Sequence, residues 1–226
     1  MNGGRRKLGQ APILEPRDKR AFLARCASPR DEVMARFSFE CGLRATEIGR
    51  VRWFMVIDPD GRVRPRMKLH HSASKGGYGG REVRISPALA IALETLWQAA
   101  APRDDRGFVI QFRKHSTDTQ IRSKSVQAFF RATYDEAGLR EASSHSGRRT
   151  AITDIARALG LKNAQTFAGH RSVATTARYE EPEYAAIDRL VDELVVNAPR
   201  LVMAKASLHN GGVGDHVSSR KGRGVA

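Results

Sequence analysis

A single block of strand-like sequence interrupts a chain whose apolar residues otherwise follow helical spacing. Within residues 51–85, three short segments favour strands, namely Trp53–Ile57, Arg62–Leu69 and Arg81–Ile85, and Asp58–Gly61 favours a tight turn. On either side of this block, apolar residues recur three or four positions apart, as they do in amphipathic helices. The sequence therefore predicts an α+β fold that is mainly helical and contains a small three-stranded antiparallel sheet.

Helix starts are marked most clearly where serine precedes proline, at residues 28–29 and 86–87. Serine caps a helix by accepting a backbone hydrogen bond, and proline fits the first helical position. Gly42 and Gly160 mark helix ends. Together with the apolar spacing, these signals predict helices over residues 16–27, 28–41, 44–50, 86–97, 124–137, 146–159, 163–168 and 183–197.

The composition fits one folded region with a segment of different character at each end. Apolar residues make up 41% of the 226 residues, which is enough to bury a core. Residues 1–16 are rich in Gly, Pro and Arg and are interpreted as a flexible basic arm. We expect residues 17–198 to form one domain and residues 199–226, rich in glycine, serine and basic residues, to form a disordered basic tail.

The charge balance favours a polyanionic partner. Lysine and arginine number 39 against 24 acidic residues, a formal net charge of +15, and neutralising phosphates releases their condensed counterions. A basic ribosomal or chaperone-like protein is the alternative that charge alone leaves open. Cys26 and Cys41 lie in apolar helical patterns, as reduced core cysteines do. No signal peptide or membrane-spanning stretch is recognised in the sequence, so the cytoplasm is the expected location.

Two arginines stand out as candidates for holding a phosphodiester. A guanidinium group makes two charge-assisted hydrogen bonds to a phosphate, and such donors stabilise the charge that develops during attack on phosphorus. Arg44 follows Gly42 at a predicted helix start, where backbone N–H groups also favour an anion. Arg148 lies three residues after His145, so both would face the same side of a first helical turn. A single arginine taken alone is more often a solvated surface group.

A nucleophile and two proton-transfer groups complete the set. Tyr179 would attack phosphorus, and nearby positive charge would lower the pKa of its phenol from about 10. His145 and His170 can donate to phosphate oxygens or transfer protons, although single histidines are more often structural. Lys75, in a glycine-rich hairpin tip, is the candidate acid for the leaving 5′ oxygen, with Lys68 as its competitor. Other tyrosines, such as Tyr78, Tyr134 and Tyr184, are decoys.

The order and spacing of these residues resemble the catalytic domain of the tyrosine recombinase (phage integrase) family. The resemblance covers about residues 28–182. It rests on three segments, which are Cys41-Gly42-Leu43-Arg44-Ala45-Thr46-Glu47-Ile48, His145-Ser146-Gly147-Arg148, and Gly169-His170 through Tyr179. It implies a supporting role for Glu47 beside Arg44. It also favours Lys75 as the hairpin lysine, because Arg81-Glu82-Val83 resembles the strand that follows that lysine in the family.

The resemblance implies a reaction, partners and a domain. Tyr179 would form a 3′-phosphotyrosyl link and release a 5′ hydroxyl, with no metal, ATP or other cofactor. The substrate would be double-stranded DNA of a mobile element, recombined or integrated by four protomers. Residues 17–198 would be the catalytic domain, and the helix over residues 183–197 would contact a neighbouring protomer.

Three departures from the family pattern leave alternatives open. Only about 27 residues precede the catalytic domain, where members usually carry a core-binding domain, and short fimbrial-type invertases or a truncated integrase share this plan. Gly147 and Ala168 are smaller than the usual residues and are expected to loosen packing. A DNA-binding remnant without catalysis and a topoisomerase-like nicking-closing enzyme are the competing interpretations. Metal-dependent hydrolysis is disfavoured, since His70-His71 has no acidic residues at ligand spacing.

Overall fold

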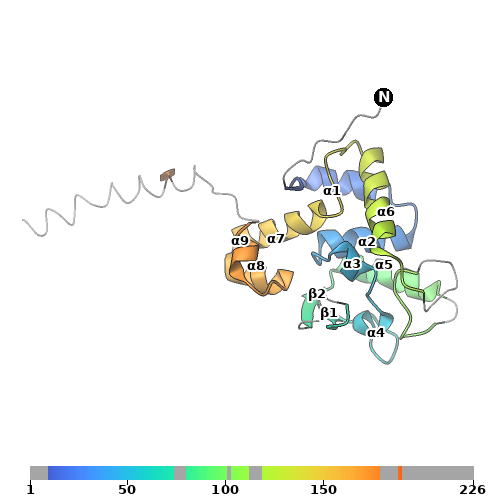
Figure 1. Ribbon diagram of the computed structural model, residues 1–226. Coiled ribbons are helices and arrows are strands. Elements are labelled where there is room, and N and C mark those ends of the chain that lie inside the picture. Colours follow the sequence, from blue (N-terminus) through green and yellow to red (C-terminus); the bar gives the residue numbers. More distant parts are fainter. Residues whose placement is uncertain (1–9, 74–79, 101–102, 112–118, 179–187, 190–226) are drawn as a thin grey trace, which may run out of the picture. The chain divides into compact units, whose positions relative to one another are not determined.

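The computed structural model describes residues 10–73, 80–100, 103–111, 119–178 and 188–189. The chain divides into one compact unit over residues 1–180 and a second unit over residues 181–226, of which Asp188 and Arg189 are described and are helical. In the order of the chain, the elements of the first unit (Figure 1) are α1 Pro16–Leu23, α2 Pro29–Phe39, α3 Ala45–Ile48, α4 Trp53–Val56, β1 Arg66–Leu69, β2 Arg81–Arg84, α5 Pro87–Gln98, α6 Ser123–Glu136, α7 Ser146–Leu159, α8 Leu161–Ala168 and α9 Val173–Ala177.

The predicted fold class is confirmed, because the described residues form a mainly helical α+β structure with a small antiparallel sheet. The two serine caps form as expected: Ser28 Oγ accepts from the Asp31 amide at 3.2 Å, and Ser86 Oγ accepts from the Leu89 amide at 3.0 Å. Both helices begin with proline. These helix starts were predictable because the capping interactions are local.

The sheet has two strands among the described residues, where the sequence predicted three. β1 and β2 pair antiparallel with Met67 opposite Val83, both buried. The segment predicted as the first strand instead forms the helical turn α4. Its backbone amides at Trp53 and Phe54 donate to carbonyls of residues 107 and 105, and the Trp53 ring packs 4.9 Å from that of Trp97. Tertiary packing therefore determines the conformation of this short apolar segment.

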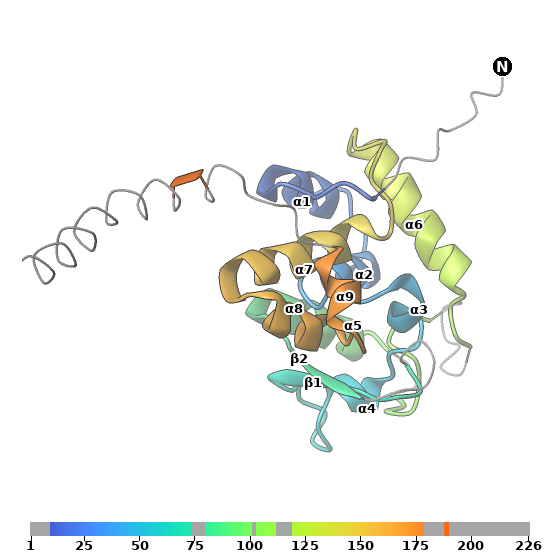
Figure 2. The same cartoon turned by 60° about the vertical axis from the view of Figure 1, so that its left-hand side comes forward.

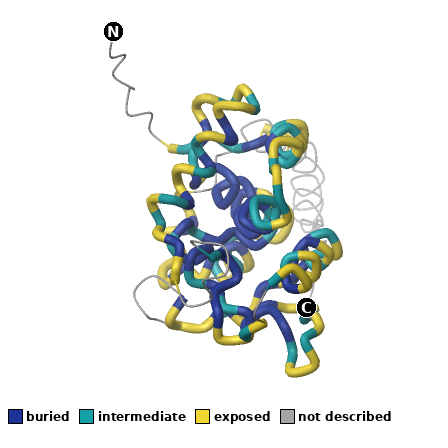
Figure 3. Tube along the Cα trace, turned by 90° about the vertical axis from the view of Figure 1, so that its right-hand side faces the viewer, coloured by how far each residue is buried: buried dark blue, intermediate teal, exposed yellow. Residues whose placement is uncertain are grey.

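The core is centred on α2, which is buried around most of its surface and contacts both α5 and α7. Figure 3 shows the buried residues gathered in the interior of the trace, with the exposed residues around them. At one end the Phe22 ring from α1 contacts an aromatic group made up of Phe39, Phe129, Phe130 and Tyr134. This packing joins α1, the end of α2 and α6.

Close contact between α2 and α7 depends on Gly147. A Cβ atom at this position would lie 2.4 Å from Cδ1 of Phe39 and 2.6 Å from Oγ of Ser38. The expectation that Gly147 loosens the packing is therefore wrong, since glycine is what allows the two helices to approach.

A second, smaller apolar cluster joins α7 to α8 through Ile152, Ala156, Ala164 and Ala168. Gly169, with φ of +63°, ends α8 and turns the chain toward α9, which lies beside α8 (Figure 2). The consequence is that the end of α8 approaches β2 and the start of α3, and this is where the candidate site lies.

Candidate active site

Arg44 and Glu47 form the first part of the site at the start of α3. The backbone amide of Arg44 donates to Oε2 of Glu47, and its Nη1 donates to Oε1 of the same carboxylate, both at 2.8 Å. Glu47 is only 1% exposed, whereas the Arg44 side chain is 25% exposed. Arg44 is thus oriented by a buried carboxylate and still reaches the surface.

Arg148 enters the same cluster from α7, with 2% of its surface exposed. Its Nη1 donates to the carbonyl of Gly42 and lies 3.6 Å from Oε2 of Glu47. Its Nη2 donates to the carbonyl of Ala168 at 2.9 Å. Backbone carbonyls from two distant segments therefore hold this guanidinium in place.

His170 lies directly against Arg148, with Nε2 at 2.9 Å from Nη2 of the arginine. Because a guanidinium group donates and never accepts, Nε2 of His170 must accept this hydrogen bond. The proton of the neutral ring is then on Nδ1, which donates to Oγ1 of Thr176 at 3.0 Å. The two contacts fix the neutral form and its tautomer.

The electrostatic surroundings act in the same direction. Burial, and then the positive charges of Arg148, Arg44 and Arg81, lower the pKa of His170 from 6.5 to about 4, while Glu47 opposes the shift. His170 is therefore uncharged at neutral pH in the substrate-free protein.

Arg81 is a member of the cluster that the sequence analysis did not select as a site residue. Its side chain is 10% exposed, and Nη2 lies 3.5 Å from Oε2 of Glu47. Its Nη1 donates to the carbonyl of Ala168, which also accepts from Arg148. A Cβ atom on Gly169 would lie 2.7 Å from this Nη1, so glycine permits the approach. Burial lowers the pKa of Arg81, but its arginine character keeps it charged.

The cluster as a whole attracts anions. It contains three guanidinium groups, from Arg44, Arg81 and Arg148, and the single carboxylate of Glu47, which leaves two net positive charges beside a neutral histidine. Donors that are oriented before the substrate arrives are the arrangement that stabilises developing negative charge most effectively.

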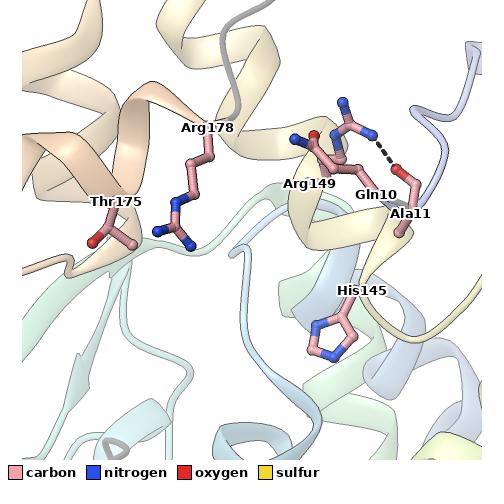
Figure 4. Close-up of a pocket in the computed structure, with 6 residues that line it drawn as sticks. All are labelled: Gln10, Ala11, His145, Arg149, Thr175 and Arg178. Atoms are coloured by element: carbon pink, nitrogen blue, oxygen red, sulfur yellow. Dashed lines mark hydrogen bonds between the residues drawn. The ribbon is translucent and has the colours of Figure 1, made fainter. Parts of the chain in front are cut away.

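His145 lies directly before α7, near the helix start expected for it. It is exposed at the residue preceding α7 and lines a cavity of about 350 Å³ (Figure 4). The other lining residues are Gln10, Ala11, Arg149, Thr175 and Arg178. The side chain that follows Arg148 in the sequence, rather than Arg148 itself, shares this cavity with His145.

Two of the predicted residues, Lys75 and Tyr179, lie outside the described residues. The described chain ends its helix α9 at Ala177, and Arg178 is the last described residue before Tyr179. The competing lysine, Lys68, is exposed on β1 opposite Glu82.

Tyr134 is removed from consideration as a nucleophile, since it is fully buried against Phe22 and burial raises its pKa. The decoys Tyr78 and Tyr184 lie outside the described residues. Among the residues that the structure describes, no group of three or more His, Cys, Asp or Glu side chains is placed to hold a metal ion. In the same part of the chain, every helix is too short or too polar to cross a membrane.

Comparison with known proteins identifies one family. A model of the phage integrase family matches residues 14–185. A comparison with curated protein sequences found no match.

Solved structures of recombinases and integrases share the fold. The XerA recombinase is 18% identical, with a TM-score of 0.63 over 81% of this chain and 66% of that one. The Tn1549 transposon integrase in complex with transposon right end DNA is 14% identical, with a TM-score of 0.61 over 84% and 68%. A lambda integrase dimer bound to a COC′ core site is 15% identical, with a TM-score of 0.57 over 78% and 49%. The chain thus spans about two thirds of the first two proteins and about half of the third.

Proposed function

This chain belongs to the phage integrase family, and we propose that it is a tyrosine-type site-specific recombinase that cuts and rejoins double-stranded DNA. The observation that carries the proposal is the meeting of Arg44, Arg148 and His170 around the buried carboxylate of Glu47. These residues come from three segments separated by 104 and 22 positions in the sequence. Two oriented guanidinium groups and an imidazole at one place provide the donors that a phosphodiester requires during attack.

In the proposed reaction Tyr179 is the nucleophile. Its phenolic oxygen attacks the scissile phosphorus, a 3′-phosphotyrosyl bond forms, and the bond to the 5′ oxygen breaks. Lys75, or Lys68 in its place, gives a proton to that 5′ oxygen. The 5′ hydroxyl of another strand then attacks the phosphotyrosyl bond, and the tyrosine leaves. Because one phosphodiester replaces another, the cycle needs no ATP and no metal.

Arg148 can bind a phosphate by exchanging one of its present contacts. Its Nη2 already donates to both Ala168 and His170. A phosphate oxygen that accepts from Nη2 would displace Nε2 of His170, which would then be available to serve the phosphate as a donor after protonation or tautomer exchange. Arg44, which is more exposed, would make the first contact, with His145 contributing from the start of α7.

DNA as substrate is supported by the charge of +15. We further propose that four protomers act on paired sites and that the helix over residues 183–197 contacts a neighbour. We also propose that the DNA belongs to a mobile element and that the protein, bacterial or phage-encoded, is cytoplasmic and associated with the nucleoid. In the same proposal, residues 17–198 form the catalytic domain.

A nicked suicide duplex that carries the terminal sequence of the gene's own element tests the reaction. We expect a denaturant-resistant protein–DNA adduct with the wild type and none with Tyr179→Phe. Binding without any wild-type adduct would contradict the proposal and indicate a DNA-binding remnant. Relaxation of DNA without recombinant junctions would indicate a nicking-closing enzyme instead.

The salt dependence of binding tests the polyanion argument separately. If about six phosphates are contacted, the slope of log affinity against log salt concentration is about −5. A flat response would contradict DNA as the partner.

A further inference from the structure

The cavity beside the start of α7 has the chemistry of an anion site. Its six lining residues include the guanidinium groups of Arg149 and Arg178, the imidazole of His145 and the hydroxyl of Thr175, and none of the six is acidic. Figure 4 shows Arg178 reaching in from the end of α9 while His145 approaches from the start of α7. A volume of about 350 Å³ has room for a phosphate and part of its sugar.

One wall of the cavity is fixed. Arg149 is 8% exposed, and its Nη1 donates to the carbonyl of Ala11. The segment that contains Ala11 is itself attached to α7, because the amide of Leu14 donates to Oγ1 of Thr150 at 2.8 Å and Leu14 is 4% exposed. The positive charge of Arg149 is thereby held at the cavity wall at a constant position.

The opposite wall of the cavity is formed by residues that are exposed to solvent. Arg178 and Thr175 lie on the solvent-exposed side of α9, and His145 is exposed as well. The side chain of Arg178 makes no hydrogen bond or ion pair with the other described residues. An exposed arginine opposite a fixed one can close on an anion from the side of the solvent.

The cavity adjoins the candidate active site through the chain itself. Arg149 directly follows Arg148, and Arg178 directly precedes Tyr179. An anion in the cavity would be bound by the residue that follows Arg148 and the residue that precedes Tyr179, which makes it a candidate for a phosphate near the one held by Arg148. Successive phosphates along a DNA strand lie near one another, since each nucleotide contributes one.

We propose that this cavity binds the DNA phosphate next to the scissile one, with Arg178 as its main cationic contact and Arg149 as the fixed one. This inference rests on the proposed function. It adds Arg178 and Arg149 as two residues that would position the DNA strand relative to Tyr179. A phosphate held by Arg178, the residue before Tyr179 in the sequence, would restrict the position of the scissile bond.

The experiment combines a protein change with a DNA change. Methylphosphonate replaces one phosphate at a time on either side of the scissile position, which removes one negative charge. Binding of each duplex is measured for the wild type, for Arg178→Gln and for Arg25→Gln, an exposed arginine outside the cavity that serves as the control.

We expect Arg178→Gln to weaken binding of the unmodified duplex about tenfold and to reduce the salt slope by about 0.9, as for one lost phosphate contact. On the duplex with methylphosphonate next to the scissile phosphate, the same change should weaken binding less than twofold, because the contact is already absent. Arg25→Gln should have the same effect on every duplex. Thr175→Val should repeat the pattern of Arg178→Gln with a smaller loss.

The outcomes separate this inference from the proposed function. A wild-type adduct on suicide DNA together with an equal effect of Arg178→Gln on all duplexes would overturn the cavity assignment alone. In a second outcome, Arg178→Gln weakens binding of every duplex except the one with methylphosphonate next to the scissile phosphate, while the wild type forms no adduct. This result would support the cavity as a phosphate site and reject the catalytic proposal. If inorganic phosphate binds in an Arg178-dependent way while the duplexes show no position dependence, the cavity binds a free anion, and the assignment to DNA is overturned.

Discussion

The hydroxyl oxygen of Thr176 lies 3.0 Å from Nδ1 of His170 and accepts its hydrogen bond, so the short helix α9 that leads to Tyr179 also orients the imidazole. Thr176 is completely buried, which excludes water as a substitute partner on the threonine side. The helix that precedes Tyr179 and the histidine are therefore connected by one hydrogen bond. Thr176 acts through His170 and is a positioning residue.

We expect Thr176→Val to slow adduct formation about tenfold, which corresponds to the ~1–1.5 kcal/mol of one hydrogen bond. Thr176→Ser, which keeps the hydroxyl, should restore most of the rate. The measurement is the single-turnover rate with saturating suicide DNA, together with ¹⁵N NMR of the His170 ring. If the valine variant retained both the rate and the Nδ1–H tautomer, this positioning role would be rejected.

The neutral state of His170 predicts a pH dependence. In the substrate-free protein, NMR titration should show its pKa near 4, lowered from 6.5 by burial and by the arginines. Added duplex DNA should raise that pKa, because a phosphate brings negative charge and displaces the contact with Arg148. A free-protein pKa of 6.5 or higher would contradict the hydrogen-bond assignment.

Stability follows the same titration. Between about pH 4 and pH 6.5 the unfolded chain binds more protons at this residue than the folded chain does. The stabilising contribution is therefore complete above pH 6.5 and is lost as the pH falls toward 4, by at most about 1.4 kcal/mol per pH unit from this residue. Urea unfolding at several pH values should show a shallower decrease for His170→Gln than for the wild type.

The sequence correctly predicted the features of the fold that depend on residues close together in the chain. The caps at Ser28 and Ser86 involve atoms three positions apart, and Gly160 ends α7 as expected. The α4 segment was predicted wrongly as a strand. Its three buried residues, Trp53, Met55 and Val56, are compatible with either a strand or a helical turn until their packing partners are known. Local patterns carry no information about the carbonyls 54 and 51 residues away that accept hydrogen bonds from the amides of Trp53 and Phe54.

The site was predictable only as a set of residue types. Arg44, Arg148 and His170 were selected from motif spacing, and the structure brings them together. Arg81 was not selected because its partners, Glu47 and the Ala168 carbonyl, lie 34 and 87 positions away. The sequence held one signal for Arg81. It is the first residue of the strand that follows the glycine-rich segment, and the antiparallel pairing of that strand places Arg81 close to Glu47 of α3.

Glu47 is expected to be the main stabilising residue of the arginine cluster. Glu47→Gln removes the carboxylate that contacts Arg44, Arg81 and Arg148, and should lower the unfolding free energy by about 3 kcal/mol because buried positive charge is left without compensation. Glu82→Gln, whose partner Arg66 is about half exposed, should change it by less than about 0.5 kcal/mol. Sulfate should recover part of the loss in the Glu47 variant, since an anion bound to the native state replaces the carboxylate. Equal effects of the two substitutions in urea unfolding would contradict this account.

The contact between α2 and α7 predicts that Gly147→Ala destabilises the protein although alanine is the better helix former. The new methyl group would meet Phe39 at 2.4 Å, and overpacking of a core contact costs about 1–3 kcal/mol against a helix-propensity gain of about 1 kcal/mol. The displaced helix start would also move Arg148, so adduct formation should slow more than unfolding stability alone explains. Phe39→Leu, which shortens the opposing side chain, should relieve the clash, and the double variant should therefore be more stable than the sum of the two single changes implies. Strictly additive losses in urea unfolding would show that α7 adjusts without strain and would remove Gly147 from the residues that fix the site.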